Sequence, residues 1–84
     1  MTRDEIKKYL TEVNTAYPKL VNLDDPKLTV DIWHEAFDEM EYEFAHKALI
    51  EHIKEGAKQP TINELYQRAK AIKRIDFFDK GGRI

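Results

Sequence analysis

Three histidines and sixteen carboxylates are the side chains in this sequence that could bind a metal ion or transfer a proton. His46 and His52 lie six residues apart, which places them on opposite sides of a helix, whereas a zinc-binding helix carries two histidines four residues apart. His34 stands beside Glu35 but has no partner at a spacing that forms a site. We therefore expect no metal site.

Carboxylates also occur in pairs, and paired acids perform general acid–base catalysis where a cleft raises one pKa. A helical domain of 84 residues offers little room for such a cleft. Glu43–Lys47 and Glu51–Glu55 are i,i+4 pairs on faces expected to be solvated, the first attractive and the second repulsive. The sequence contains no serine, no cysteine and no glycine-rich phosphate loop, so the usual nucleophiles and nucleotide-binding motifs are missing. We expect no enzyme activity, no catalytic residue and no cofactor.

The charged residues are unevenly distributed along the chain. Residues 1–57 hold seven basic and thirteen acidic side chains, whereas residues 58–84 hold seven basic and three acidic ones. An acidic body with a basic end suggests two surfaces that face different partners. The N-terminal residues are charged where a signal peptide needs an apolar run, and no apolar stretch approaches the roughly 20 residues that span a bilayer. We expect a single cytoplasmic domain with no membrane contact.

The first helix is predicted over residues 3–16. Thr2 and Glu5 form a capping box at its start, and Pro18 ends it because the residue before a proline is pushed out of the helical region. The second helix is predicted to start at Asp25–Pro26, with Thr29 as an alternative cap. The apolar face of the second helix consists of Val30, Trp33, Ala36, Phe37 and Met40.

A change in the phase of the apolar residues predicts a break near residues 38–41 and a third helix over residues 42–55. Gly56 is expected to close this helix in the left-handed conformation. One long kinked helix is the alternative. The stripe of the third helix consists of Tyr42, Ala45, Ala48, Leu49, His52 and Ile53, with Phe44 and Ile50 beside it.

A second capping box, formed by Thr61 and Glu64, predicts the start of a fourth helix. Its apolar face consists of Ile62, Leu65, Ala69 and Ile72, with Ile75 as a further candidate. The pattern is lost afterwards, so we predict a helical domain over residues 1–74 and a short, flexible tail over residues 75–84. The fold class is all-α: a small bundle of about four short amphipathic helices.

Five residues near the C-terminus are the candidates for contact with a partner protein: Lys73, Arg74, Phe77, Phe78 and Arg83. Two adjacent phenylalanines outside the strong periodicity either fold over the core as a clasp or anchor another protein. Other large apolar residues are assigned to the core: Trp33, Phe37, Leu49 and Leu65.

Three stretches of the sequence follow one another in an informative order: "MTRDEIKKYLTEVNTAYP", "DDPKLTVDIWHEAFDEMEYEFAHKALIEHI" and "QPTINEL". They contain a first helix ending in Ala-Tyr-Pro, a T-V-x-x-W second helix, an A-L-x-x-(H/Y)-I third helix and a Pro-Thr-Ile turn. This ordered set resembles the N-terminal helical domain of the phage-type replicative helicase loader/inhibitor family, over residues 1–66. The matching positions are Ala16, Tyr17, Pro18, Thr29, Val30, Trp33, Ala48, Leu49, Ile53, Pro60, Thr61 and Ile62.

The resemblance implies a non-enzymatic adaptor in DNA replication, located in the cytosol of a bacterial host. Proteins of this family bind the replicative DNA helicase, hold it inactive and hand it to an origin-binding initiator protein. A flexible C-terminal segment is important for the helicase contact in the family. Only ten residues follow residue 74 here, so this segment is either short in this member or truncated.

Two other functions are consistent with the residues. A small DNA-binding regulator would use the basic fourth helix, with Arg68, Lys70, Lys73 and Arg74 near the phosphates. Because the domain as a whole is acidic, direct nucleic-acid binding is not expected. A structural or anti-host protein that binds another replication factor is the third possibility.

Overall fold

The structure is a computed structural model that describes residues 1–56 and 58–81. Its elements are four helices: α1 (Arg3–Ala16), α2 (Pro26–Ala36), α3 (Tyr42–Lys54) and α4 (Ile62–Asp79). No strand occurs among the described residues, which confirms the predicted all-α class. None of these helices has both the length and the apolar character needed to cross a bilayer.

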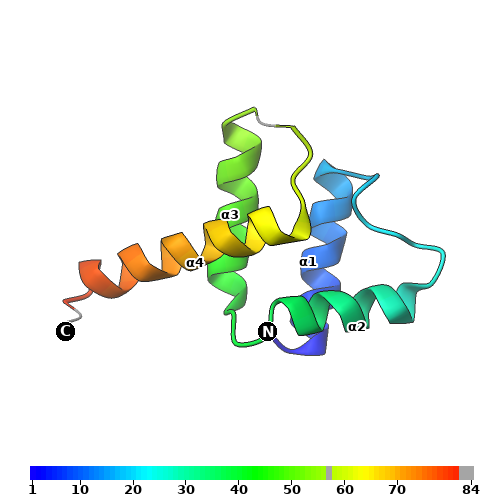
Figure 1. The fold of residues 1–84 in the computed structure, drawn as a ribbon, viewed down its shortest axis with the longest axis horizontal. Helices are drawn as coiled ribbons and strands as arrows, with labels where there is room; N and C mark the ends of the chain where they lie inside the picture. The colour runs from blue at the N-terminus through cyan, green and yellow to red at the C-terminus, as the bar shows by residue number, and fades with distance from the viewer. Residues whose placement is uncertain (57, 82–84) are drawn as a thin grey trace.

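The four helices form two crossing pairs (Figure 1). Helices α1 and α3 run side by side in the same direction, and α2 and α4 cross them steeply, α2 against α1 and α4 against α3. The C-terminal part of α4 continues past α3 and leaves the bundle (Figure 1). The described chain is accordingly elongated, measuring 45 × 28 × 17 Å.

The core lies where the four helices meet. Tyr9 packs edge-on against Trp33 and Phe37, whose rings stack with their centroids 5.8 Å apart. Tyr66 of α4 approaches Phe37 edge-on at 5.7 Å, so aromatic rings from α1, α2 and α4 form one cluster. The four residues assigned to the core are confirmed there: Trp33, Phe37, Leu49 and Leu65 are all at most 3% exposed.

The predicted helix ends are confirmed closely. Thr2 and Glu5 form the capping box of α1, and the carboxylate of Asp25 accepts the Leu28 N–H at 3.1 Å, which caps α2. Thr29 is not a cap: it is buried inside α2, where its hydroxyl donates to the Asn22 carbonyl. Such a bond fastens the α1–α2 loop to the helix.

The break between α2 and α3 is also confirmed, and the alternative of one long kinked helix is wrong. Glu39 has φ of 64°, a left-handed conformation that L side chains rarely adopt and that ends the preceding helix. Met40, directly after it, is only 3% exposed and anchors the turn in the core. Gly56 takes the expected left-handed conformation after α3, with φ of 67°.

The periodicity misplaced one residue of α3. Ile53, predicted on the buried stripe, is 42% exposed, whereas Phe44, predicted beside the stripe, is buried. His52 occupies the buried position next to Ile53, and neighbouring residues of a helix are about 100° apart, so only one of the two faces the core.

Candidate protein-binding surface

Helix α4 starts in a well-defined place because its first turn is capped. The Glu64 N–H donates to the Thr61 hydroxyl at 3.0 Å, and the Thr61 N–H donates to the Glu64 carboxylate at 3.2 Å. This is the predicted capping box. Leu65 and Ala69, on the face below, are fully buried. The first two turns of α4 therefore belong to the bundle.

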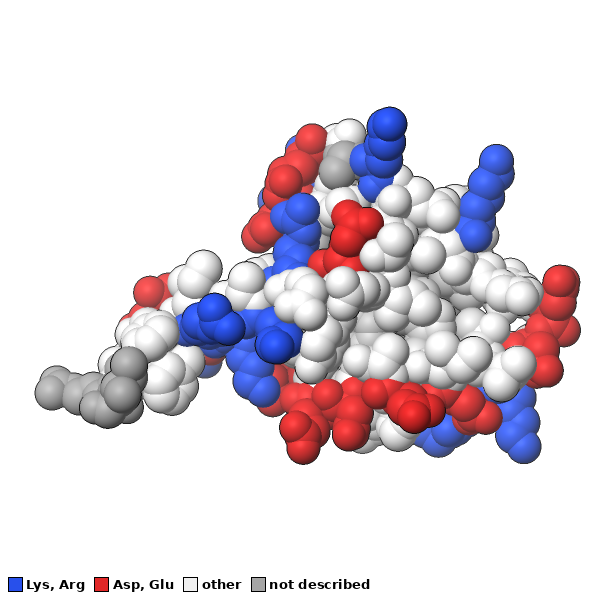
Figure 2. Space-filling view, in the orientation of Figure 1, with Lys and Arg blue, Asp and Glu red and all other residues white. Residues whose placement is uncertain are grey.

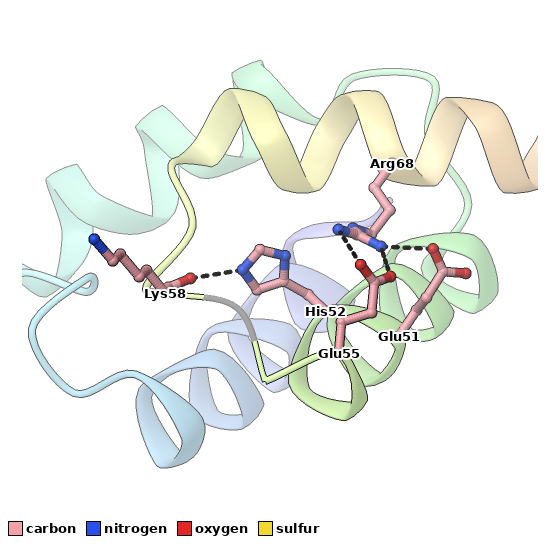
Figure 3. A network of polar contacts seen from close by, with 5 residues as sticks. All are labelled: Glu51, His52, Glu55, Lys58 and Arg68. Carbon is pink, nitrogen blue, oxygen red and sulfur yellow. Dashed lines mark hydrogen bonds and ion pairs between the residues drawn. The ribbon is translucent and has the colours of Figure 1, made fainter.

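A buried histidine holds the loop before α4. His52 Nε2 lies 2.7 Å from the Lys58 carbonyl oxygen, which can only accept, so Nε2 carries the proton (Figure 3). The His52 ring packs edge-on against Tyr17 at 5.9 Å, and Pro60 is fully buried beyond it. The direction in which α4 leaves the loop is set by these contacts.

Arg68 joins α4 to α3 through two carboxylates. Its guanidinium pairs with Glu51 at 2.6 Å and with Glu55 (Figure 3). The hydrogen bond from Arg68 lowers the pKa of Glu55, and the same bond raises the pKa of Arg68. Glu51 and Glu55 were expected to repel each other on a solvated face, but Arg68 neutralises both. No sequence signal pointed to this contact, because it joins two helices.

Lys73 ties α4 to the turn between α2 and α3. Its ammonium lies 2.9 Å from the Glu41 carboxylate and 3.5 Å from the Glu39 carbonyl oxygen. The Lys73 hydrogen bond lowers the pKa of Glu41. Lys73, one of the predicted partner-binding residues, therefore already has a partner within the chain and fixes the angle at which α4 projects.

A groove of about 500 Å³ lies between α4 and the α2–α3 turn. We call it the α4 groove, and its lining consists of Glu39, Met40, Tyr66, Lys70, Lys73, Arg74, Phe77 and Phe78. Four of the five predicted partner-binding residues meet here. Arg83, the fifth, lies outside the described residues.

Sequence reasoning missed Met40 in this role and assigned Tyr66 and Lys70 only to the DNA-binding alternative. A signal for the α4 side existed: Tyr66, Lys70, Lys73 and Phe77 are spaced four, three and four residues apart, which places them on one helix face. That face starts one residue after the buried one, about 100° around the axis.

The apolar residues at the end of α4 are exposed. Phe77 is 52% and Phe78 50% exposed, and their ring centroids lie 5.6 Å apart. The proposed clasp over the core is therefore wrong. Ile75, a candidate for the buried face, is 60% exposed. The helix runs to Asp79, across the predicted boundary at residue 74, because nothing before Gly81 interrupts it. The division into a domain and a tail stays a prediction.

The charges around the α4 groove are asymmetric. Figure 2 shows basic side chains over α4 where it leaves the bundle, and acidic side chains along the edge near α2. Lys70 and Arg74 are exposed, and neither has an ion-pair partner among the described residues. The Lys70 ammonium lies 5.8 Å from the centre of the Tyr66 ring. The groove thus offers two available cations beside apolar surface.

A separate polar cluster joins α1 to α3 and is structural in character. The Tyr42 hydroxyl donates to one oxygen of Glu12 at 2.7 Å, and His46 Nδ1 lies 3.2 Å from the other. Burial and then the Glu12 hydrogen bond raise the pKa of Tyr42 to about 12, so the phenol is a protonated donor at neutral pH. No group of three or more metal-ligating side chains occurs among residues 1–56 and 58–81.

A protein-family model for the N-terminal domain of a phage helicase inhibitor/loader matches residues 1–66. These residues include α1, α2, α3 and the capped first turn of α4, and they stop at the edge of the α4 groove. No curated protein and no solved structure matches the chain.

Proposed function

This chain belongs to the family of phage helicase inhibitor/loader N-terminal domains, and from this premise we propose that it is a non-enzymatic adaptor in DNA replication. It binds the replicative DNA helicase in the cytosol of the bacterial host and regulates its loading. An origin-binding initiator protein is the second partner. The contact with the helicase is made by the α4 groove and the exposed end of α4.

One observation carries the assignment of the surface. Apolar side chains are exposed together on the end of α4, where they contribute nothing to the core: Ile75, Phe77 and Phe78 are each at least half exposed. Clustered exposed apolar residues that include aromatic ones are typical of protein–protein contacts. Arg74 and Lys70, beside them, add the directional charge that orients an approaching partner.

The test is the capture of the cognate replicative helicase by this chain, with and without ATP. A chain that ends after residue 74 retains α1, α2, α3 and every fully buried residue, so its circular dichroism remains helical. We expect its affinity for the helicase to fall by at least about ten-fold, because two aromatic anchors are lost. A shortened chain that binds as tightly as the whole chain contradicts the assignment to the end of α4.

A suitable control lies on another helix. Leu28 of α2 is 52% exposed, the same as Phe77, and lies outside the α4 groove. Leu28→Ala therefore removes a comparably exposed apolar side chain and should leave helicase binding unchanged.

DNA binding by α4 is the alternative, and the ion pairs weigh against it. Arg68 and Lys73, two of the four basic residues that it requires, are already paired with carboxylates of this chain. A mobility-shift assay at low and moderate salt separates the two functions, because phosphate contacts weaken steeply as salt is added. A tight, strongly salt-dependent complex with duplex DNA would favour the alternative.

A further inference from the structure

The α4 groove has an apolar floor. Met40, at the α2–α3 turn, is 3% exposed, and the partly buried Tyr66 packs against the core cluster. Phe77 extends the apolar surface outward along α4, beyond the bundle. A partner that covers this floor must present a complementary apolar strip of similar direction.

Two cations on the same face of α4 border that floor. Lys70 and Arg74 are four residues apart, so their side chains neighbour one another about 6 Å apart at Cβ. Lys73 lies between them in the sequence but is paired with Glu41. The available positive charge is therefore a pair at helical spacing, set beside an apolar strip.

We propose that the α4 groove binds an acidic amphipathic helix of its protein partner. The apolar side of that helix covers Met40, Tyr66 and Phe77, and its carboxylates pair with Lys70 and Arg74. This inference rests on the proposed adaptor function and adds the chemistry of the element that is recognised.

A helix fits this surface better than an extended segment. Extended peptides bind by adding a strand to a sheet edge, and the described part of the chain contains no sheet. Lys70, Arg74 and Phe77 are presented along a helical ridge at steps of four and three residues. A second helix packed against this ridge repeats the same steps, so its acidic and apolar residues meet the cations and the floor in register.

A short acidic helix also fits the charges better than a nucleic acid does. Nucleic acid is a continuous polyanion, and affinity for it rises with the number of phosphates that are neutralised. Only Lys70 and Arg74 are available beside the groove among its described lining residues, and Glu39 lines its opposite side. A strand that continued past the two cations would meet the acidic edge along α2 (Figure 2). A helix bearing carboxylates on one side only ends its charge at the groove.

The probe is a synthetic amphipathic peptide of about 16 residues, enough for about four helical turns. It carries leucine on one face, with glutamate flanking the leucines, and its twin carries lysine in place of every glutamate. Fluorescence anisotropy gives each dissociation constant with the whole chain, and backbone amide shifts map the contact. We expect the acidic peptide to bind at least about ten-fold more tightly than its twin, with shifts around Met40, Tyr66, Lys70 and Phe77.

A charge reversal sharpens the test. The variant Lys70→Glu/Arg74→Glu should reverse the preference, so that the lysine twin binds more tightly. Lys19 and Lys27 are exposed and lie outside the groove, so Lys19→Glu/Lys27→Glu changes the net charge equally and should keep the original preference. Equal binding of both peptides, shifts away from the groove, or no shift at millimolar acidic peptide would overturn the inference.

The remaining outcomes separate this inference from the proposed function. Helicase capture without any preference between the peptides overturns the acidic helix alone. Peptide preference without helicase capture supports the groove and contradicts the helicase as its partner. A thymidine oligonucleotide that shifts the same groove residues, and displaces the acidic peptide, identifies the groove as a nucleic-acid site and overturns the inference.

Discussion

The two halves of α4 are alike in composition but differ in what covers them. Residues 62–69 include Leu65 and Ala69, both fully buried. Residues 70–79 have no buried side chain, although they include two isoleucines and two phenylalanines. Apolar residues at helical spacing are therefore buried only as far as a neighbouring element extends, and the uncovered remainder is available for a partner.

The projecting half of α4 is nevertheless held in a fixed direction. Arg68 fastens α4 to α3, and Lys73 fastens it to Glu41 at the α2–α3 turn. Such pre-orientation lowers the cost of ordering the surface when a partner binds. The covered half thus supplies stability, and the contacts at its end position the half that binds.

The sharpest way to break this comparison is to truncate one apolar residue in each half. Leu65→Ala leaves a cavity in the core and should lower the free energy of unfolding by about 2–5 kcal/mol. Phe77→Ala removes a half-exposed ring and should change it by less than about 1 kcal/mol. Urea denaturation followed by circular dichroism measures both. Equal losses for the two variants would show that the projecting half also belongs to the core.

A smaller effect is expected at the start of the covered half. Thr61→Ala removes the hydroxyl that accepts the Glu64 N–H, and should lower the free energy of unfolding by about 1 kcal/mol. Thr61→Ser keeps the hydroxyl and serves as the matched control. A loss with serine as large as with alanine would mean that the methyl group, and not the cap, is responsible.

The smallest effect concerns the ion pairs at the boundary between the halves. The pKa values of Glu41 and Glu55 are lowered in the folded chain by Lys73 and Arg68, respectively. The stability that these pairs contribute is present above the ordinary carboxyl value of 4.5 and is lost as the pH falls through the lowered pKa values. We therefore expect the free energy of unfolding to decline on acidification.

The variant Arg68→Met tests the contribution of one pair. It removes the partner of Glu55 and leaves Glu51 and Glu55 to repel each other, so this part of the decline on acidification should disappear. Urea denaturation at about pH 6 and about pH 3.5 compares the variant with the natural chain. An unchanged pH dependence would indicate that the Arg68 pairs add no stability in solution.

Local sequence features were enough to predict the helices but not the surface. Thr2, Asp25 and Thr61 cap helices through contacts three residues away, so the helix starts could be predicted. The contact between Arg68 and Glu55 joins different helices, and a single sequence does not show which faces meet. Ile75 continued the apolar spacing of α4, yet periodicity does not indicate where the covering helix ends.

The binding residues were predicted in part for the same reason. Phe77 and Phe78 stood out because they fell outside the strong periodicity, and both line the α4 groove. Met40 could not be found in this way, because it enters the groove from a turn 26 residues before Tyr66 in the sequence. The left-handed Glu39 that forms this turn is not a glycine or an asparagine, so its residue type gave no signal.

The most direct test of the central claim measures helicase affinity and stability on the same preparation of Phe77→Ala/Phe78→Ala. The account predicts a free energy of unfolding within about 1 kcal/mol of the natural chain, together with at least about a ten-fold loss of affinity for the cognate replicative helicase. Undiminished affinity would contradict it, and so would a loss of stability as large as that of Leu65→Ala.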